Sequence, residues 1–467
     1  MMKLKINALS QPANWLAGFF SDREYFSQLF RLAAPIALQN FIMSSLNMVG
    51  TLLIGQLGET SVAAVALANQ IFFLLTLTLF GISSGAAMFT AQLWGKRDIP
   101  NIRRVLGLSL ILGVGLALVF TGIALLAPGA ALGVYSRDQA VIALGSSYLR
   151  IFGWSYPFMA ITFSYALVLR SIGDVKTPLI VSTGALAFNT LLSYGLILGK
   201  MGFPALGVEG AALAALTARL LECGILVLIT FWQKSPLAGG LKEMLRIDRG
   251  FAWRVLKPVL PVALNELLWS LGITTYYIIY ARIGTTSVAA MNIAASIDGV
   301  ALVVFIGIGN ACAILVGNRI GAGDEAAAYR YASRSLVLGI LAAILVGGLV
   351  LIGAAPILSF YKVDPVVIGY ARKILTIIAG FLWVRISNLI LIVGIFRSGG
   401  DTRFSLTVDA GLIWTVGVPL ALIGGFVLHL PIYGVYLLVM VDESTKFILS
   451  LYRFTSRKWI HNLVDAV

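Results

Sequence analysis

The chain has few residues that carry charge, bind metals or form disulfides. Asp, Glu, Lys and Arg make up 12% of its 467 residues, about half the share of a soluble domain. It contains two histidines and two cysteines, Cys223 and Cys312, and both cysteines lie in apolar segments. This composition excludes a disulfide framework or a Cys/His metal site. Without a Ser-His-Asp arrangement, an enzyme is not expected either.

The few charges are spaced so unevenly that long uncharged stretches separate them. No charge occurs between Arg31 and Glu59, between Glu59 and Lys96, or between Arg104 and Arg137. Each stretch can hold the roughly 20 apolar residues that cross a bilayer as a helix. Because 59% of the residues are hydrophobic, the sequence predicts an all-α integral membrane protein.

The net charge of +14 reports membrane topology. Most of the 34 Lys and Arg residues lie near the two ends of the chain and in alternate loops. Positively charged loops stay on the cytoplasmic side of a membrane. We therefore expect a multi-pass protein of a bacterial or archaeal plasma membrane with both termini cytoplasmic. The lipid bilayer is an expected partner, and the sequence indicates no nucleic acid and no obligate protein partner.

Apolar runs bounded by Gly, Pro and charge predict twelve membrane-spanning helices. We expect them to form two six-helix lobes around a central cavity, the first over residues 29–233 and the second over 253–454. Residues 14–30 are interpreted as either an interfacial helix or a disordered arm. The remaining predicted segments are the N-terminal arm 1–28, the cytoplasmic linker 234–252 and the cytoplasmic tail 455–467.

The second half of the sequence repeats the first. GETSVAA begins at Gly58, and adding 226 gives Gly284, where GTTSVAA begins. RSIGD begins at Arg170, and adding 227 gives Arg397, where RSGGD begins. Since six spans are an even number, both copies start on the same side of the membrane. Such parallel repeats are related by an axis along the membrane normal, with the substrate site between them.

Ionisable residues inside the predicted spans are the candidates for function. A charge in hydrocarbon costs at least ~2.5–3.5 kcal/mol on insertion scales, so such residues face a cavity or a partner. Arg219 and Glu222 are three residues apart, and Asp442 and Lys446 are four apart. We interpret both as structural ion pairs on a helix surface.

Four further ionisable residues of the second lobe have no such local partner and form the candidate functional set: Glu266, Asp298, Arg385 and Asp409. Buried Arg385 requires a counter-ion, which we predict to be Glu266 or Asp409.

Two spans that correspond in the repeat carry polar stripes at helical spacing. In the second lobe the stripe is Glu266, Ser270, Thr274 and Tyr277. In the first lobe it is Asn40, Ser44, Asn47 and Thr51. Adding 226 to Asn40 gives Glu266, so only the second lobe has an acid at this position. The stripes either hydrogen-bond neighbouring helices or line an aqueous cavity, and the duplication favours the cavity.

The ordered set of motifs resembles the multidrug and toxic compound extrusion (MATE) family over roughly residues 25–458. The resemblance depends on Pro35, the GxxSVAA echo, GKRD and GAGD, RSIGD and RSGGD, and GVEGAA from Gly207. It implies two six-helix lobes around a V-shaped cavity that faces each side in turn. It also implies export of organic, often cationic compounds in exchange for H⁺ or Na⁺. Glu266 is similar to the family's coupling acid on the seventh helix, and Asn189 to a fifth-helix residue of the first-lobe site.

The chain departs from the family pattern at three positions. Gly50, Ser193 and Ile386 stand where relatives have acids on the first, fifth and tenth helices. The first-lobe proton site is therefore incomplete, and Asp409 or Asp298 is the candidate partner of Glu266. The missing acid at Ile386 favours H⁺ slightly. A Na⁺ ion held by Glu266 and nearby hydroxyl or carbonyl oxygens is the alternative, and no other cofactor is expected.

Two other transporter classes compete with this hypothesis. A flippase of the same superfamily, moving a lipid-linked anionic headgroup, requires several basic residues in its cavity. The candidates are Arg150, Arg219 and Arg385, of which Arg219 has a local partner. An exporter of the major facilitator class is the third hypothesis, but AQLWGKRDIP after the second span fits its loop signature poorly.

Overall fold

The computed structural model describes residues 22–361 and 363–465, and throughout this part the regular structure is helical. The first lobe comprises α2 (Arg23–Gly55), α3 (Glu59–Gly95), α4 (Ile99–Leu126), α5 (Pro128–Gly133), α6 (Gln139–Phe152), the 3₁₀ turn η1 (Gly153–Ser155), α7 (Tyr156–Ser171), α8 (Lys176–Leu198) and α9 (Gly207–Trp232).

The short α10 (Leu241–Met244) precedes the second lobe. This lobe comprises α11 (Arg249–Ile283), α12 (Thr285–Gly321), α13 (Glu325–Leu358), α14 (Pro365–Leu389), α15 (Thr402–Leu412), α16 (Val418–Leu422) and α17 (Ile432–Thr455). Three π-helical segments, η2 (Ile390–Phe396), η3 (Ile413–Gly417) and η4 (Ile423–Val427), interrupt its last third.

Eleven helices of the described residues are long and apolar enough to cross a membrane. A twelfth helix, α17, has 24 residues but carries four charged residues, Asp442, Glu443, Lys446 and Arg453. The predicted all-α membrane fold with two six-helix lobes is therefore confirmed.

The motifs that occur in both halves of the sequence form turns and helix starts with the same geometry in both lobes. Asp98 accepts a hydrogen bond from Asn101 N at 3.2 Å, and Asp324 accepts one from Ala327 N at 2.9 Å. Each carboxylate thereby satisfies a backbone N–H that a helix start leaves free. In RSIGD and RSGGD, Gly173 and Gly400 have φ of 94° and 79°, which favours glycine.

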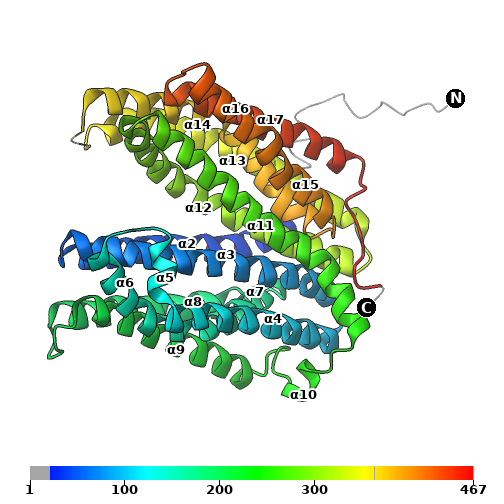
Figure 1. The fold of residues 1–467 in the computed structure, drawn as a ribbon. Helices are drawn as coiled ribbons and strands as arrows, with labels where there is room; N and C mark the ends of the chain where they lie inside the picture. The colour runs from blue at the N-terminus through cyan, green and yellow to red at the C-terminus, as the bar shows by residue number, and fades with distance from the viewer. Residues whose placement is uncertain (1–21, 362, 466–467) are drawn as a thin grey trace.

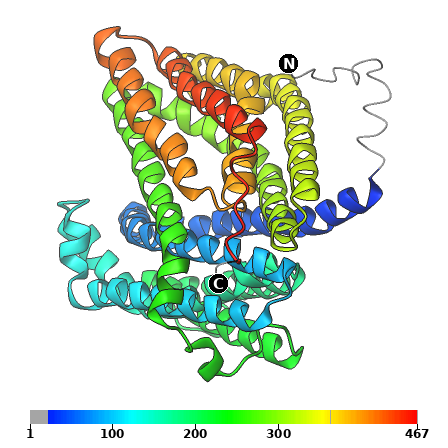
Figure 2. The same ribbon diagram turned by 90° about the vertical axis from the view of Figure 1, so that its right-hand side faces the viewer.

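The two lobes converge at one end of the molecule and diverge at the other. Figure 1 shows them one above the other, meeting on the right near the C-terminus and separating towards the left. Figure 2 looks onto the end where they meet, which we call the convergent end. There, α3 and α12 approach closely through equivalent glycines: a Cβ on Gly95 would lie 2.0 Å from the Asn318 carbonyl oxygen, and one on Gly321 would lie 1.8 Å from that of Gln92.

The C-terminal residues bind both lobes at the convergent end. Lys96 Nζ on the first lobe donates to the Val464 carbonyl at 3.0 Å. His461 N donates to the Gly399 carbonyl of the second lobe at 2.8 Å. The Trp459 side chain is fully buried. The segment after α17 therefore lies across the contact between the lobes.

Two helix starts differ from the predicted positions. Residues 14–21 of the predicted interfacial helix lie outside the described residues, and from Arg23 onward the chain belongs to α2 without a break at residue 28. Helix α11 begins at Arg249, before the predicted start at 253. Asp248 caps it by accepting from Phe251 N at 2.8 Å and pairs with Arg104 of α4 at 2.8 Å.

Candidate functional site

A cavity of ≈ 320 Å³ lies in the second lobe where it faces the first. Its charged lining residues come from four elements of the second lobe and the turn after η2: Glu266 (α11), Arg385 (α14), Arg397, Asp409 (α15) and Glu443 (α17). Phe80 of the first lobe and Trp269 of α11 supply aromatic surface. The volume lies in the lower range of cavities that bind small organic molecules.

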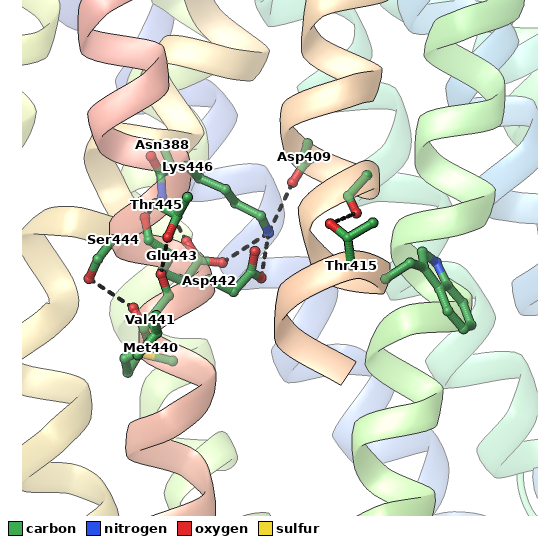
Figure 3. Close-up of polar contacts among 12 residues, drawn as sticks. Asn388, Asp409, Thr415, Met440, Val441, Asp442, Glu443, Ser444, Thr445 and Lys446 are labelled. Carbon is green, nitrogen blue, oxygen red and sulfur yellow. Dashed lines mark hydrogen bonds and ion pairs between the residues drawn. The ribbon is translucent and has the colours of Figure 1, made fainter. Parts of the chain in front are cut away.

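Lys446 lies behind this cavity and contacts three carboxylates. Its Nζ is 3.0 Å from Asp442 Oδ2, 3.4 Å from Glu443 Oε1 and 3.5 Å from Asp409 Oδ1. The Lys446 side chain is only 1% exposed. Figure 3 shows the ammonium reaching from α17 towards α15, with the carboxylates around it. These four residues form what we call the Lys446 cluster.

Two asparagines connect the Lys446 cluster to neighbouring helices. Asn265 of α11 donates from Nδ2 to Asp409 Oδ2 at 2.9 Å. Asn388 of α14 donates from Nδ2 to Glu443 Oε2 at 2.8 Å. The buried Asp442 Oδ1 has no hydrogen-bond partner among the described residues. The cluster lies on α15 and α17, and the two asparagines connect it to α11 and α14. One of its carboxylate oxygens remains unsatisfied.

The charges of the Lys446 cluster do not balance. Three carboxylates against one ammonium give a net charge of −2 when all are ionised. Like charges this close repel one another, and a bound cation reduces that repulsion. The cluster is therefore suited to taking up a cation.

Glu266, the acid singled out from the sequence, lines the cavity and pairs with Arg397. Its Oε1 is 2.6 Å from Arg397 Nη1, and the two side chains are 12% and 7% exposed. The carboxylate is therefore desolvated, but a guanidinium from the RSGGD motif balances its charge.

The prediction that Glu266 or Asp409 is the counter-ion of Arg385 was wrong. Arg385 binds Asp298 of α12 with two hydrogen bonds, at 3.0 Å from Nη1 to Oδ1 and 2.9 Å from Nη2 to Oδ2. This bidentate geometry leaves Asp298 with its charge paired. The misassignment arose because the sequence does not show that α12 packs beside α14.

A second cavity, of ≈ 380 Å³, lies in the first lobe. Asn47, Thr51 and Asn189 line it, together with Arg219 and Glu222. Arg219 Nη1 lies 2.6 Å from Glu222 Oε2. The predicted Arg219–Glu222 ion pair is confirmed.

The two polar stripes line the cavities only in part. Asn40 and Ser44 lie outside the lining of the first-lobe cavity, and in the second lobe only Glu266 of its stripe lines the cavity. Ser270 is buried, and Thr274 Oγ1 donates to the Ser270 carbonyl at 2.9 Å, within the same helix. Tyr277 packs against Tyr280, with ring centroids 6.0 Å apart. Hydrogen bonding and packing within the lobe thus account for Thr274 and Tyr277.

Sequence reasoning missed the Lys446 cluster as a site, although the Asp442–Lys446 pair is confirmed. The available signal was the presence of Asp442, Glu443 and Lys446 together in one apolar span. What the sequence does not reveal is that Asp409, on another helix, reaches the same ammonium. Arg397 and Asn388 were also missed. Among the described residues, no three His, Cys, Asp or Glu side chains are placed to hold a metal ion.

Comparison with known proteins gives matches over most of the chain. The model of the MatE family matches residues 35–195 and 261–423. The chain is 28% identical over 463 residues to an uncharacterized transporter, YisQ, of Bacillus subtilis, covering 98% of each chain. It is 25% identical to the probable multidrug resistance protein NorM of Thermotoga maritima, covering 92% of each.

Solved structures share the fold. A crystal structure of the Vibrio cholerae MATE transporter VcmN matches with a TM-score of 0.84 at 18% identity, over 93% of this chain and 97% of that one. An outward-facing multidrug resistance MATE family transporter of the MOP superfamily matches with a TM-score of 0.81 at 20% identity, over 92% and 96%.

Proposed function

Because the chain belongs to the MatE family of multidrug efflux transporters, we propose that it exports small amphipathic organic cations in exchange for H⁺ by alternating access. It is a multi-pass membrane transporter and not an enzyme.

The charge imbalance of the Lys446 cluster carries the proposal. Asp409, Asp442 and Glu443 share one buried ammonium. Keeping a net charge of −2 in the membrane interior costs free energy, and binding one cation reduces that cost. Asp409 and Glu443 also line the cavity, so a cation in the cluster and a cationic substrate in the cavity experience the same carboxylates.

Competition for these carboxylates provides coupling. A bound proton removes negative charge that attracts the substrate, and a bound cationic substrate disfavours protonation. By linkage, the two effects on binding free energy are equal. Trp269 and Phe80 supply ring faces for cation–π contact with the substrate. Glu266 adds a carboxylate at the same cavity, which becomes available when Arg397 moves away.

The geometry favours H⁺ over Na⁺. Na⁺ is a hard cation that oxygen ligands must surround, and the Lys446 ammonium already lies among the three carboxylates. A Na⁺ ion would have to displace the ammonium, whereas a proton binds a single carboxylate oxygen, such as the unpartnered Asp442 Oδ1.

The charge distribution of the second-lobe cavity disfavours a lipid-linked anionic substrate. Arg385, Arg397 and Lys446 each pair with at least one carboxylate. The two arginines that line this cavity, Arg385 and Arg397, are therefore each neutralised by a carboxylate, which disfavours binding of a phosphate group. We also propose that the convergent end faces the cytoplasm, because the basic turn after α3, with Lys96 and Arg97, lies there.

A transport assay in proteoliposomes tests the proposal. We expect a pH gradient, and not a Na⁺ gradient, to drive export of a fluorescent organic cation such as ethidium. Asp409→Asn should abolish this transport because it removes one carboxylate of the Lys446 cluster. Glu209→Gln, at an exposed position on α9, is the matched control and should transport normally. Full pH-driven transport by Asp409→Asn would contradict the proposal.

The same assay tests the earlier assignment of Glu266. Glu266→Gln should reduce pH-driven transport, because the variant lacks a carboxylate at the cavity, whereas Asn40→Ala should retain coupling. Unchanged transport by Glu266→Gln would mean that Glu266 is not needed for coupling and that the Lys446 cluster alone provides it.

A further inference from the structure

A third, smaller cavity lies between the two lobes at the convergent end. Its volume is ≈ 60 Å³, enough for about four water-sized ligands and too small for a drug-sized molecule. Equivalent residues of the repeat line it from both sides: Arg170 and Arg397, Ser171 and Ser398, and Ser84 and Asn310. The cavity therefore lies where the pseudosymmetry of the two lobes brings two arginines together.

Arg170 has no carboxylate partner among the described residues. Its Nη2 donates to the neutral amide oxygen of Gln39 at 2.7 Å. Its Nε is buried and makes no hydrogen bond within the described part of the chain. Burying an unpaired cation is costly in a membrane protein, so an unbalanced positive charge at this place calls for an anion.

Arg397 also lines this cavity, and it too has an unused donor. It pairs with Glu266 through Nη1, and its side chain is 7% exposed. Its Nε is buried and, like that of Arg170, has no partner among the described residues. Arginine carries five N–H donors and no acceptor, so only an acceptor can satisfy these groups.

The other polar groups at the cavity are already engaged. Ser171 Oγ donates to the Val168 carbonyl at 2.7 Å, and Ser398 Oγ donates to the Gly394 carbonyl at 2.7 Å. Asn310 Nδ2 donates to the Ile306 carbonyl at 2.8 Å. The two arginines thus supply the charged donors at the cavity. Because Glu266 balances only one of them, the net charge is positive.

We propose that this cavity binds a small inorganic anion of the chloride class between Arg170 and Arg397. Since the two arginines belong to opposite lobes, the anion links the lobes and stabilises the conformation in which the convergent end is closed. Separation of the lobes would pull the arginines apart and release the anion. The inference does not depend on the identity of the exported substrate or of the coupling cation.

Thermal unfolding of the purified full-length protein tests the site. Sodium chloride is titrated against sodium gluconate at constant ionic strength, because gluconate is too large for the cavity. We expect a saturable rise in Tm with chloride. Arg170→Gln should raise the half-saturating chloride concentration at least about tenfold, because the variant loses one charge-assisted hydrogen bond to the anion. Arg150→Gln, which removes an exposed arginine of the same lobe, should respond like the parent protein.

The proposal is wrong if chloride and gluconate give the same Tm in the parent protein, or if Arg170→Gln keeps the parent response to chloride. Should Arg170→Gln fail to fold, the unmodified protein still provides a test. Crystals soaked in bromide should show an anomalous peak between Arg170 and Arg397. Absence of that peak at saturating bromide would equally overturn the site.

Discussion

Lys446 supplies the positive charge that three carboxylates of the second lobe share. It is almost fully buried, and its three acidic neighbours come from its own helix and from α15. An ion pair in such a place gains little net stability, but removing one partner leaves uncompensated buried charge. Lys446 thus keeps three carboxylates close together at the edge of a cavity.

We predict that Lys446→Met destabilises the protein strongly. The variant retains three buried carboxylates with no ammonium, and breaking a buried pair costs about 3–5 kcal/mol. Thermal unfolding in detergent measures the change. Adding Asp442→Asn should recover part of the loss, because it removes one of the unpaired charges. Lys242→Met, at an exposed position on α10, is the control. An equal effect of the two Lys→Met changes would refute the role of Lys446 in charge balance.

The candidate residues could be found from the sequence, but their partners could not. Glu266, Asp298, Arg385 and Asp409 were identified because charge inside an apolar span is rare and costly. Pairs on one helix, such as Arg219–Glu222, follow from spacing. Arg385 and Asp298 are 87 positions apart, and only the packing of α12 beside α14 brings them together.

Among the helices, α3 and α12 determine how closely the lobes approach at the convergent end. The glycine of each GKRD or GAGD motif, Gly95 or Gly321, faces a backbone carbonyl of the opposite helix. In lipid, helices associate mainly by close packing, which small residues permit. The repeated glycine therefore has a packing role that the motif alone does not reveal.

We predict that Gly95→Ala loosens the convergent end. Its Cβ would lie 2.0 Å from the Asn318 carbonyl oxygen, so the helices must move apart, at a cost of about 1–3 kcal/mol. Gly115→Ala on α4 is the matched control, because its Cβ meets nothing within 4 Å. Thermal unfolding should show a lower Tm for Gly95→Ala only. A Tm equal to that of Gly115→Ala would argue against close packing here.

The helices themselves were largely predictable. Charge-free stretches revealed the spans because a bilayer excludes charge, and the repeat indicated two equivalent lobes. The π-helical segments were not predictable, since they depend on packing around single turns. One of them, η2, ends just before Arg397 and helps to place that side chain between the lobes.

At the scale of the whole molecule, three features close the convergent end. The α3–α12 contact, the C-terminal residues that bind both lobes, and the two arginines at the small cavity all lie there. A switch to the opposite conformation must separate all three. The Lys446 cluster, in contrast, lies within one lobe, so its occupancy can change before the lobes move.

In the proposed mechanism, substrate and proton compete for the carboxylates of the second lobe. Proton release on substrate binding tests it most directly. Purified protein in weakly buffered detergent solution is mixed with ethidium, and the pH is followed with an indicator dye. The account predicts release of protons from the parent protein and much less from Asp409→Asn. Substrate binding without any proton release from the parent protein would contradict the account.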